Sequence, residues 1–293
     1  MYFLNYVING ALVGLVYALI AMGFVVIYRA SKVFNLAQGE LVVIGGFLVW
    51  WAVVDLSLPL AIGLPLAFIC AAAFGLAIER IFFARMAGES VFAMVMVTIG
   101  LMILLRGVVL IIFGPQAHPF PIVFPLTPVI IGDLLIPKSL LYGGGLTVLA
   151  GCGLAWFFSR TRLGLRMTAV AEDHQVAMSL GISVRWSVAF AWMLGSVLST
   201  LGAIVFLSGK SLSFMTSEIG LLALPVALLA GLESIAGLLL AGVIIGVVQG
   251  LATAYLDPLV GGSVGAVLPF FIMLLILLVR PTGMFGWKTI ERV

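Results

Sequence analysis

Residues 159–186, SRTRLGLRMTAVAEDHQVAMSLGISVRW, form the most polar stretch of this sequence and separate two long apolar runs. The charged residues and histidine of the stretch are Arg160, Arg162, Arg166, Glu172, Asp173, His174 and Arg185. Its centre predicts a short helix with Glu172 and Asp173 in an early turn. Gly181 follows Leu180 as the stop, since glycine readily adopts the left-handed conformation that ends many helices.

One face of this predicted helix is apolar. The residues that share it are Val170, Val176, Ala177 and Leu180. A helix with one apolar and one polar face is expected to dock against another surface. Basic residues flank the segment on both sides, and the positive-inside rule therefore predicts that it lies in the cytoplasm.

Composition predicts an all-α, polytopic transmembrane bundle. The 293 residues are 64% hydrophobic and only 9% charged, and the mean hydropathy is +1.33. Several apolar runs reach the ~20 residues that a helix needs to cross a bilayer. Such continuous runs exclude an outer-membrane barrel, whose strands alternate over about ten residues. The net charge of +3 does not indicate nucleic-acid binding, because the basic residues lie at the helix ends.

The sequence carries no pattern typical of an enzyme. Cys70 and Cys152 lie inside apolar runs and are expected to be small buried residues, not a disulfide or metal ligands. His118 and His174 are predicted on opposite sides of the membrane, so one chain can form neither a two-histidine metal site nor a Ser–His pair. No phosphate-binding loop of the form G-x-x-x-x-G-K-[ST] is present. We therefore expect no catalytic residues, no metal and no cofactor in this chain.

The apolar runs predict eight or nine spans. The longer ones are about Leu4–Tyr28, Leu36–Val54, Leu60–Ile78, Val91–Phe113, Ser139–Phe158, Ser187–Leu207, Ile235–Tyr255 and Gly265–Val279. A shorter run, Ile219–Gly231, carries Pro225 and is expected to cross or to be half of a broken crossing. Residues 114–138 are rich in proline, which excludes a continuous helix and predicts an external loop.

The basic residues set the predicted orientation. With an external N-terminus and a cytoplasmic C-terminus, eleven of the fourteen lie in internal segments: Arg29, Lys32, Arg80, Arg85, Arg160, Arg162, Arg166, Arg185, Arg280, Lys288 and Arg292. Only Lys138 and Lys210 fall outside, a distribution that the positive-inside rule strongly favours. Arg106 lies within a span about two turns from its outer end, and we expect it to extend to the external interface.

Two polar helix entrances suggest weak internal symmetry. FNLAQGE at 34–40 precedes one glycine-containing helix, and AGLESIAG at 230–237 precedes another. Paired interruptions in two halves of a transporter indicate a pathway. The candidate pathway or gate residues are Asn35, Gln38, Gly39, Glu40, Glu233 and Ser234. The alternative is structural, with Asn35 capping the helix and Glu40 near its positive end, and we prefer it because Glu40 is predicted close to the interface.

Three glycines form a smooth stripe on the predicted span 235–255. Gly242, Gly246 and Gly250 recur at intervals of four residues and let another helix approach closely. The sequence leaves open whether that neighbour belongs to this chain or to another subunit.

Four segments in this order resemble a known family. NLAQGE at 35–40, AEDHQVAMSLGI at 171–182, AGLESIAGLLLAG at 230–242 and LVRPTGMFG at 278–286 are similar to permease subunits of ABC importers for branched-chain amino acids, of the shorter, LivH type. The resemblance covers nearly the whole chain. The third segment departs from the family pattern, since Ala230 replaces a glycine and Ala236 a proline.

The resemblance implies a single transmembrane permease domain over residues 1–293, with a cytoplasmic coupling loop at 159–186 and an external loop at 114–138. It also implies that the coupling loop contacts an ATPase. The residues assigned to that contact are Ala171, Glu172, Asp173, Ala177, Leu180 and Gly181.

The implied partners are a second permease, either a paralogue or another copy, two cytoplasmic ATPase subunits that carry ATP and Mg²⁺, and a periplasmic substrate-binding protein. The expected location is the bacterial inner membrane. Importers of urea or amides share this architecture and are one alternative. A transporter driven by an ion gradient is another, but it requires a relay of carboxylates within the membrane. A membrane enzyme is disfavoured by the missing nucleophile and metal ligands.

Overall fold

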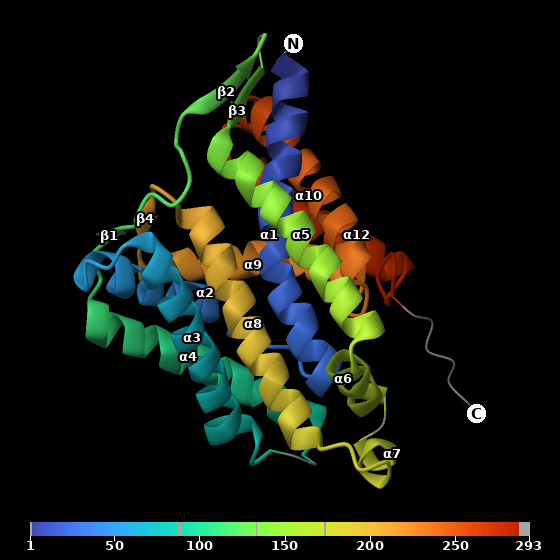
Figure 1. Ribbon diagram of the computed structural model, residues 1–293. Coiled ribbons are helices and arrows are strands. Elements are labelled where there is room, and N and C mark those ends of the chain that lie inside the picture. Colours follow the sequence, from blue (N-terminus) through green and yellow to red (C-terminus); the bar gives the residue numbers. More distant parts are fainter. Residues whose placement is uncertain (1, 87–88, 133, 173, 287–293) are drawn as a thin grey trace.

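The computed structural model describes residues 2–86, 89–132, 134–172 and 174–286, which fold into a bundle of helices (Figure 1). The helices are α1 (Tyr2–Ser31), α2 (Gln38–Trp50), α3 (Leu60–Ile78), α4 (Val91–Phe113), α5 (Lys138–Arg160), α6 (Arg162–Glu172), α7 (His174–Ser179), α8 (Val184–Leu207), α9 (Glu218–Ala230), α10 (Ile235–Tyr255), α11 (Asp257–Val260) and α12 (Val264–Val279). Three short turns of other helix types extend or precede them: η1 (Trp51–Asp55), η2 (Glu79–Phe83) and η3 (Phe214–Ser217).

Seven helices within the described residues are long and apolar enough to cross a membrane. They are Tyr2–Ser31, Gln38–Asp55, Leu60–Phe83, Val91–Phe113, Lys138–Arg160, Val184–Leu207 and Ile235–Tyr255. Phe214–Ala230 and Val264–Val279 are shorter apolar helices. The prediction of a polytopic helical membrane protein is confirmed, and the predicted bounds of α4 and α10 agree to the residue.

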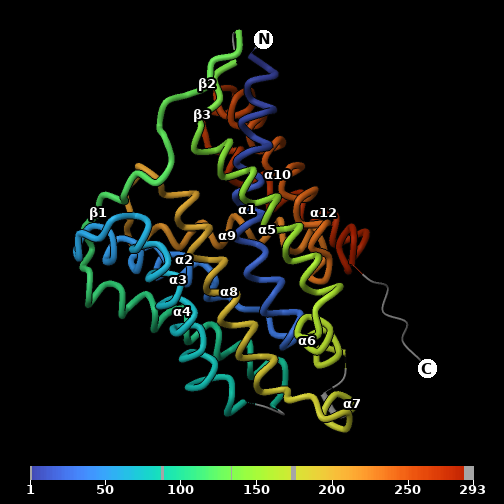
Figure 2. Tube along the Cα trace, in the orientation of Figure 1, coloured from blue at the N-terminus to red at the C-terminus, as the bar shows by residue number. Residues whose placement is uncertain are grey.

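Two helices form the centre of the bundle. In their most hydrophobic windows, 78% of the residues of α1 and 67% of those of α8 are buried, whereas the value for α4 is 22%. Figures 1 and 2 show α1 running through the middle of the molecule from the N-terminus to α6. An all-apolar helix suits lipid and protein interior alike, so the central position of α1 follows from its small residues, such as Gly10 and Gly14, which let α10 approach closely. The outer faces of α3, α4 and α5 remain apolar and exposed.

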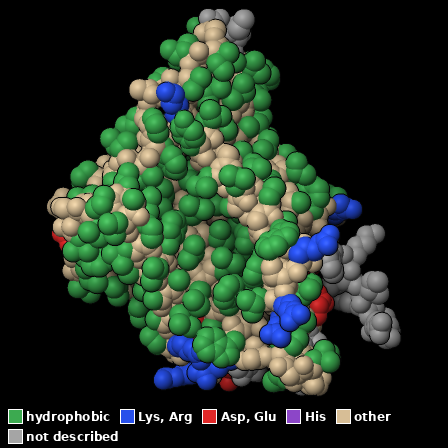
Figure 3. Space-filling model, viewed as in Figure 1, with side chains coloured by type: hydrophobic (Ala, Val, Ile, Leu, Met, Phe, Trp, Pro, Cys, Tyr) green, Lys and Arg blue, Asp and Glu red, His purple; other side chains and the backbone are tan. Residues whose placement is uncertain are grey.

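The two ends of the bundle differ in chemistry. At one end, strands β2 (Pro128–Ile131) and β3 (Leu134–Pro137) form an antiparallel hairpin beside the start of α1 (Figure 1). At the other, α6 and α7 protrude, and Figure 3 shows basic side chains near them around a largely hydrophobic surface. We call these the hairpin end and the basic end.

The proline-rich loop contains short strands that the sequence did not predict. Besides the hairpin, β1 (His118–Pro119) pairs with β4 (Ser211–Leu212). The hairpin is joined to α1 by two asparagines: Asn5 Oδ1 accepts from the Leu135 N–H at 3.2 Å, and Asn9 Nδ2 donates to the Leu135 carbonyl at 3.0 Å. The absence of a continuous helix in 114–138 is as expected.

The polar stretch 159–186 differs from its prediction in one respect. It forms two helices, so Glu172 is the last residue of α6 and not in an early turn. Val170 on α6 and Ala177 on α7 are buried, but Leu180 is 71% exposed, because the two helices present different faces to the bundle. Gly181 has a φ of +73° and ends α7 as expected. Asp173 lies outside the described residues.

Cys70 is half-buried and Cys152 is exposed, and neither forms a disulfide. The expectation that both are buried is therefore wrong for Cys152, which lies on the uncovered side of α5.

The glycine stripe of α10 packs against α1 of the same chain. A Cβ at Gly242 would meet the Gly14 carbonyl, and one at Gly246 would collide with the backbone of Gly10 and Gly14. Gly250 lies against Gly10 as well. Backbone-to-backbone contact of this kind gives close van der Waals packing, which is the main attraction between helices in lipid.

We predict that Gly246→Ala destabilises the protein by about 1–3 kcal/mol, because the added methyl group overpacks a contact between two rigid backbones. Gly107→Ala is the matched control. Gly107 is also helical, but nothing lies within 4 Å of its Cβ position. Gly107→Ala should therefore leave the stability unchanged or increase the free energy of unfolding by about 0.5–1 kcal/mol. Thermal unfolding in detergent measures both, and equal midpoints would contradict the packing role.

Candidate functional site

The start of α2 lies inside the bundle. Gln38 Nε2 donates to the Ile20 carbonyl at 3.3 Å and to Ser199 Oγ at 2.8 Å. Ile20 precedes the last residue of α1, Ser31, by eleven positions, which corresponds to roughly 16 Å along the helix. The linker of residues 32–37 therefore runs back along α1, and α2 begins near the middle of that helix.

Side chains replace the missing helical hydrogen bonds of this linker. Asn35 Oδ1 accepts from the Ala37 N–H at 3.1 Å, and Thr98 Oγ1 of α4 accepts from the Leu36 N–H at 3.3 Å. Asn35 and Gln38 are fully buried. The cap position of α2 is occupied by Ala37, which makes no side-chain cap. The expectation that Asn35 caps the helix is thus wrong, and Asn35 instead closes the turn before it.

The start of α9 meets the start of α2. A Cβ at Gly220 would collide with the backbone of Gly39, and a Cβ at Gly39 would collide with the Ser217 carbonyl. Both α-helices have 13 residues. Two helices that begin face to face direct their positive ends to one region of the bundle. Interrupted helices in membrane transporters place such ends at the transported solute.

An ion pair between a buried carboxylate and a half-exposed guanidinium lies at this meeting point. Glu40, in the first turn of α2, is 1% exposed, and its Oε1 lies 2.9 Å from Arg106 NH2 and 3.0 Å from Arg106 Nε. The same guanidinium donates to Ser217 Oγ at 2.8 Å. The expected extension of Arg106 to the outer interface is therefore wrong, because a buried carboxylate with few other partners holds it inside. Glu40, Arg106 and Ser217 are called the inner cluster below.

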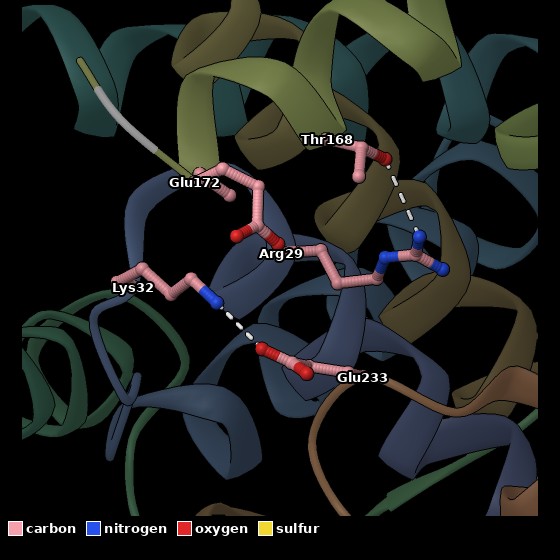
Figure 4. A pocket seen from close by; sticks show the side chains of 6 residues that line it. Arg29, Lys32, Thr168, Glu172 and Glu233 are labelled. Carbon is pink, nitrogen blue, oxygen red and sulfur yellow. Dashed lines mark hydrogen bonds and ion pairs between the residues drawn. The ribbon is translucent and has the colours of Figure 1, made fainter. Parts of the chain in front are cut away.

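A second polar site lies at the basic end (Figure 4). This pocket is lined by Arg29, Lys32, Thr168, Ala171, Glu172 and Glu233. They come from the end of α1, from α6 and from the loop between α9 and α10, so three segments distant in sequence converge here. Two basic and two acidic side chains balance in formal charge, which gives the pocket no excess charge for a free anion or cation.

Two contacts join these segments. Lys32 Nζ lies 2.5 Å from Glu233 Oε1, and Arg29 NH2 donates to Thr168 Oγ1 at 3.3 Å (Figure 4). The guanidinium of Arg29 also lies 4.2 Å from the ring centroid of Phe158. The residue after Glu233, Ser234, caps α10 by accepting from the Gly237 N–H at 3.0 Å. Of the two predicted entrance residues in this loop, Glu233 thus forms an ion pair with Lys32, and Ser234 caps α10.

Helix α6 is held tightly to the bundle. Gly164 lies on the backbone of Phe157 and Phe158, where a Cβ would collide. Met167 and Val170 are buried. A displacement of α6 is therefore transmitted to α5 and, through Arg29, to α1.

Helix α7 protrudes from the basic end and leaves apolar side chains uncovered (Figure 1). Met178 is 58% exposed and Leu180 is 71% exposed, while Ala177 faces inward at 1%. The two predicted contact residues on α6 lie in the pocket, and Ala171 is 8% exposed. The predicted contact residues 171–181 that the structure describes thus divide between the pocket and this protruding helix.

At the hairpin end, Lys210 is the basic residue of the connection from α8 to η3. Lys210 is exposed, but the protein packed beside its ammonium partly desolvates it and lowers its pKa from the ordinary value. Its ammonium lies 4.2 Å from the centroid of the Phe206 ring. Desolvation of an ammonium disfavours the charged form, and the aromatic face offsets part of that effect.

Across the described residues, no group of three or more His, Cys, Asp or Glu could hold a metal ion. The two sites are built from ion pairs, amides, hydroxyl groups and close glycine contacts. Such groups can bind and guide a polar solute or transmit movement.

A family model described as "Branched-chain amino acid transport system / permease component" matches residues 6–277. The chain belongs to this family of permeases. The match includes α2 and α9, the inner cluster, α6 and α7.

Three relatives illustrate the similarity. This permease is 29% identical to the high-affinity branched-chain amino acid transport system permease protein BraD of Pseudomonas aeruginosa. The alignment is 314 positions long and covers 100% of this chain and 98% of BraD. It is 29% identical to LivH of Salmonella typhimurium over 315 residues, with the same coverage. A probable LivH of Methanocaldococcus jannaschii is 26% identical over 302 residues, which cover 94% of this chain and 90% of the relative. No solved structure matches this permease.

Sequence reasoning missed five members of the two sites. Arg106 was expected at the external interface, Ser217 and Thr168 were not singled out, and Arg29 and Lys32 were used only for orientation. One signal was available for Arg106, since an arginine within a span is unfavourable without a partner.

We predict that Glu233→Gln changes the free energy of unfolding by less than about 1 kcal/mol, because its ion pair with Lys32 is about one-third exposed. Arg106→Gln should cost about 3 kcal/mol or more, since it leaves the buried Glu40 carboxylate without its cation. Unfolding of the purified variants in detergent compares them. A larger effect of Glu233→Gln would contradict this ranking of the two pairs.

Proposed function

We propose that this chain is one of two permease subunits in an ATP-driven importer of branched-chain amino acids. The support is its membership of the permease family, together with relatives that are named for high-affinity transport of these substrates and align over the full chain. The second permease is a paralogue or another copy of this chain. Two ATPase subunits supply ATP and Mg²⁺, and a periplasmic binding protein supplies the amino acid.

The observation that carries the proposal is the protruding helix α7. Met178 on α7 and Leu180 directly after it expose apolar surface on a segment that extends from the basic end. Apolar surface that points away from the bundle beside basic residues is suited to a groove on a cytoplasmic protein. By the positive-inside rule, the basic end faces the cytoplasm, where the ATPases are.

The pocket at the basic end supplies a route for movement. When the ATPases close, they displace α7 and α6 together, and α6 is bonded to α1 through Thr168 and Arg29. The adjacent ion pair of Lys32 and Glu233 joins the linker before α2 to the loop before α10. Closure of two ATPases can thus reach both polar helix entrances and switch which side of the pathway is open.

The hairpin end then faces the periplasm. We assign the docking of the loaded binding protein to the external segment 114–138 and to β4 in the segment 209–217, whose last residue, Ser217, instead reaches the inner cluster. The termini follow from this orientation, with the N-terminus outside and the C-terminus in the cytoplasm.

The deciding experiment is uptake of radiolabelled leucine by proteoliposomes that contain both permeases and both ATPases, with the loaded binding protein outside and ATP inside. We expect uptake that requires both ATP and the binding protein. Uptake by the permease alone under a proton or sodium gradient would overturn the proposal in favour of a secondary transporter. ATP-dependent uptake of urea or an amide, without uptake of leucine, would reassign the substrate.

A variant tests the contact with the ATPase. Leu180→Glu should reduce uptake and binding-protein-stimulated ATP hydrolysis by about tenfold or more, because it places a charge in an apolar contact. Co-purification of the ATPase subunits with the permease should fall in parallel.

The matched control is Leu259→Glu, which introduces the same charge at an 80% exposed leucine of α11, near the hairpin end. It should leave ATP hydrolysis unchanged. Wild-type hydrolysis by the Leu180 variant, at normal expression, would exclude α7 from the contact.

A further inference from the structure

The inner cluster is only half satisfied. Both contacts from Arg106 reach Oε1 of Glu40. The other carboxylate oxygen, Oε2, is buried without a hydrogen-bond partner among the described residues. Natural structures pair nearly all buried charged oxygens, so an orphaned one calls for an explanation.

The guanidinium is also incompletely covered. Forty-five per cent of the Arg106 side chain is exposed, although Arg106 is seven residues, or about 10 Å, inside the end of α4. A charge at such depth is strongly unfavourable against hydrocarbon. We therefore infer that water or protein, not lipid, covers this face in the assembled importer.

The surface around the cluster combines charge with apolar groups. Glu218 directly follows Ser217 and is exposed. On the same side of η3 and α9, Met215 is 59% exposed and Leu221 is 55% exposed, three residues before and after Glu218. The residues between them that face inward include Ser217, Ile219 and Gly220.

We propose that Arg106 and Glu40 bind the charged end of a zwitterionic α-amino acid during its passage through the pathway. Arg106 takes the α-carboxylate, Oε2 of Glu40 accepts from the α-ammonium, and Met215 and Leu221 contact the apolar side chain. The inference rests on the proposed function and adds to it the place where the substrate is held.

The chemistry selects a zwitterion over a simple ion. A guanidinium can bind a carboxylate with two parallel hydrogen bonds. A solute with only a carboxylate would draw Arg106 away and leave the buried Glu40 unpaired. A solute with only an ammonium would leave Arg106 unpaired at membrane depth. The zwitterion pairs both charges at once. Arg106 and Glu40 then each replace their mutual contact with a contact to the substrate.

The observed arrangement is the closed form of this site. Glu40 is enclosed, and the contacts of Arg106 with Glu40 and Ser217 join α4 to α2 and η3. An amino acid enters only when these elements separate, which links occupancy to the movement of the bundle.

Thiol protection tests the site directly. In the complete importer, Cys70→Ala and Cys152→Ala remove the native thiols, and Met215→Cys places one beside the cluster. Alkylation is measured once with ATP and once without it. In the state that exposes the site, leucine at twice its dissociation constant for the site should slow alkylation about threefold. Isopentylamine, which lacks the carboxylate, and 4-methylpentanoate, which lacks the ammonium, should not slow it at the same concentration. Equal protection by all three, or none by leucine in either state, overturns the inference.

A double variant separates binding from structure. Glu40→Gln with Arg106→Gln keeps the shapes and a hydrogen bond but removes both charges, so the complex should assemble and retain binding-protein-stimulated ATP hydrolysis. Uptake of leucine should fall about tenfold or more. Arg85→Gln, at an exposed arginine after η2, is the control and should leave uptake unchanged. Wild-type uptake by the double variant makes the pair structural and overturns the inference, while the proposed function stands. Lack of ATP-dependent leucine uptake by the wild type would contradict the proposed function itself.

Discussion

A chain that enters a bilayer must satisfy its backbone N–H and C=O groups from within the protein, because hydrocarbon offers no hydrogen bonds. Continuous helices meet this requirement alone, but the linker of residues 32–37 and the turn before α9 do not. Ser31, Asn35 and Thr98 accept from the N–H groups of Val33, Ala37 and Leu36 in the linker. Close contact of Gly39 with Gly220 then excludes lipid from the two helix starts. The polar interior of this permease exists because these few side chains make an interrupted helix tolerable.

The two polar sites are connected through that same linker. Lys32 begins it with a φ of +53° and pairs with Glu233, and Gln38 ends it in contact with α1 and α8. Five residues therefore separate a contact at the basic end from the buried start of α2. A short segment held by several hydrogen bonds transmits a shift better than a flexible loop, since it has few alternative conformations. This arrangement gives a physical reason for the polar helix entrance at 34–40.

Sequence was sufficient for the spans because long apolar runs have one stable solution in lipid. It located α4 and α10 to the residue and identified the stop at Gly181. It failed where tertiary contacts decide. Arg106 was assigned by distance to the end of its helix, but the carboxylate of Glu40 attracts it inward. Asn35 has the composition of a cap, yet the linker path makes it a turn residue. The stripe of Gly242, Gly246 and Gly250 predicted close packing, but only the fold shows that α1 is its neighbour.

The central position of α1 also bears on how the protein is made. Among the described helices α1 is synthesised before the others, but α8 and α10, which bury most of it, begin at residues 184 and 235. Until they are synthesised, the faces of α1 that they later cover are exposed to lipid, with α5 packed on part of the helix. An amphipathic helix would be unstable in that interval, whereas a uniformly apolar one is not. The lack of a polar face on α1 thus suits the nascent chain as well as the finished bundle, and a polar substitution there should harm biogenesis before it harms transport.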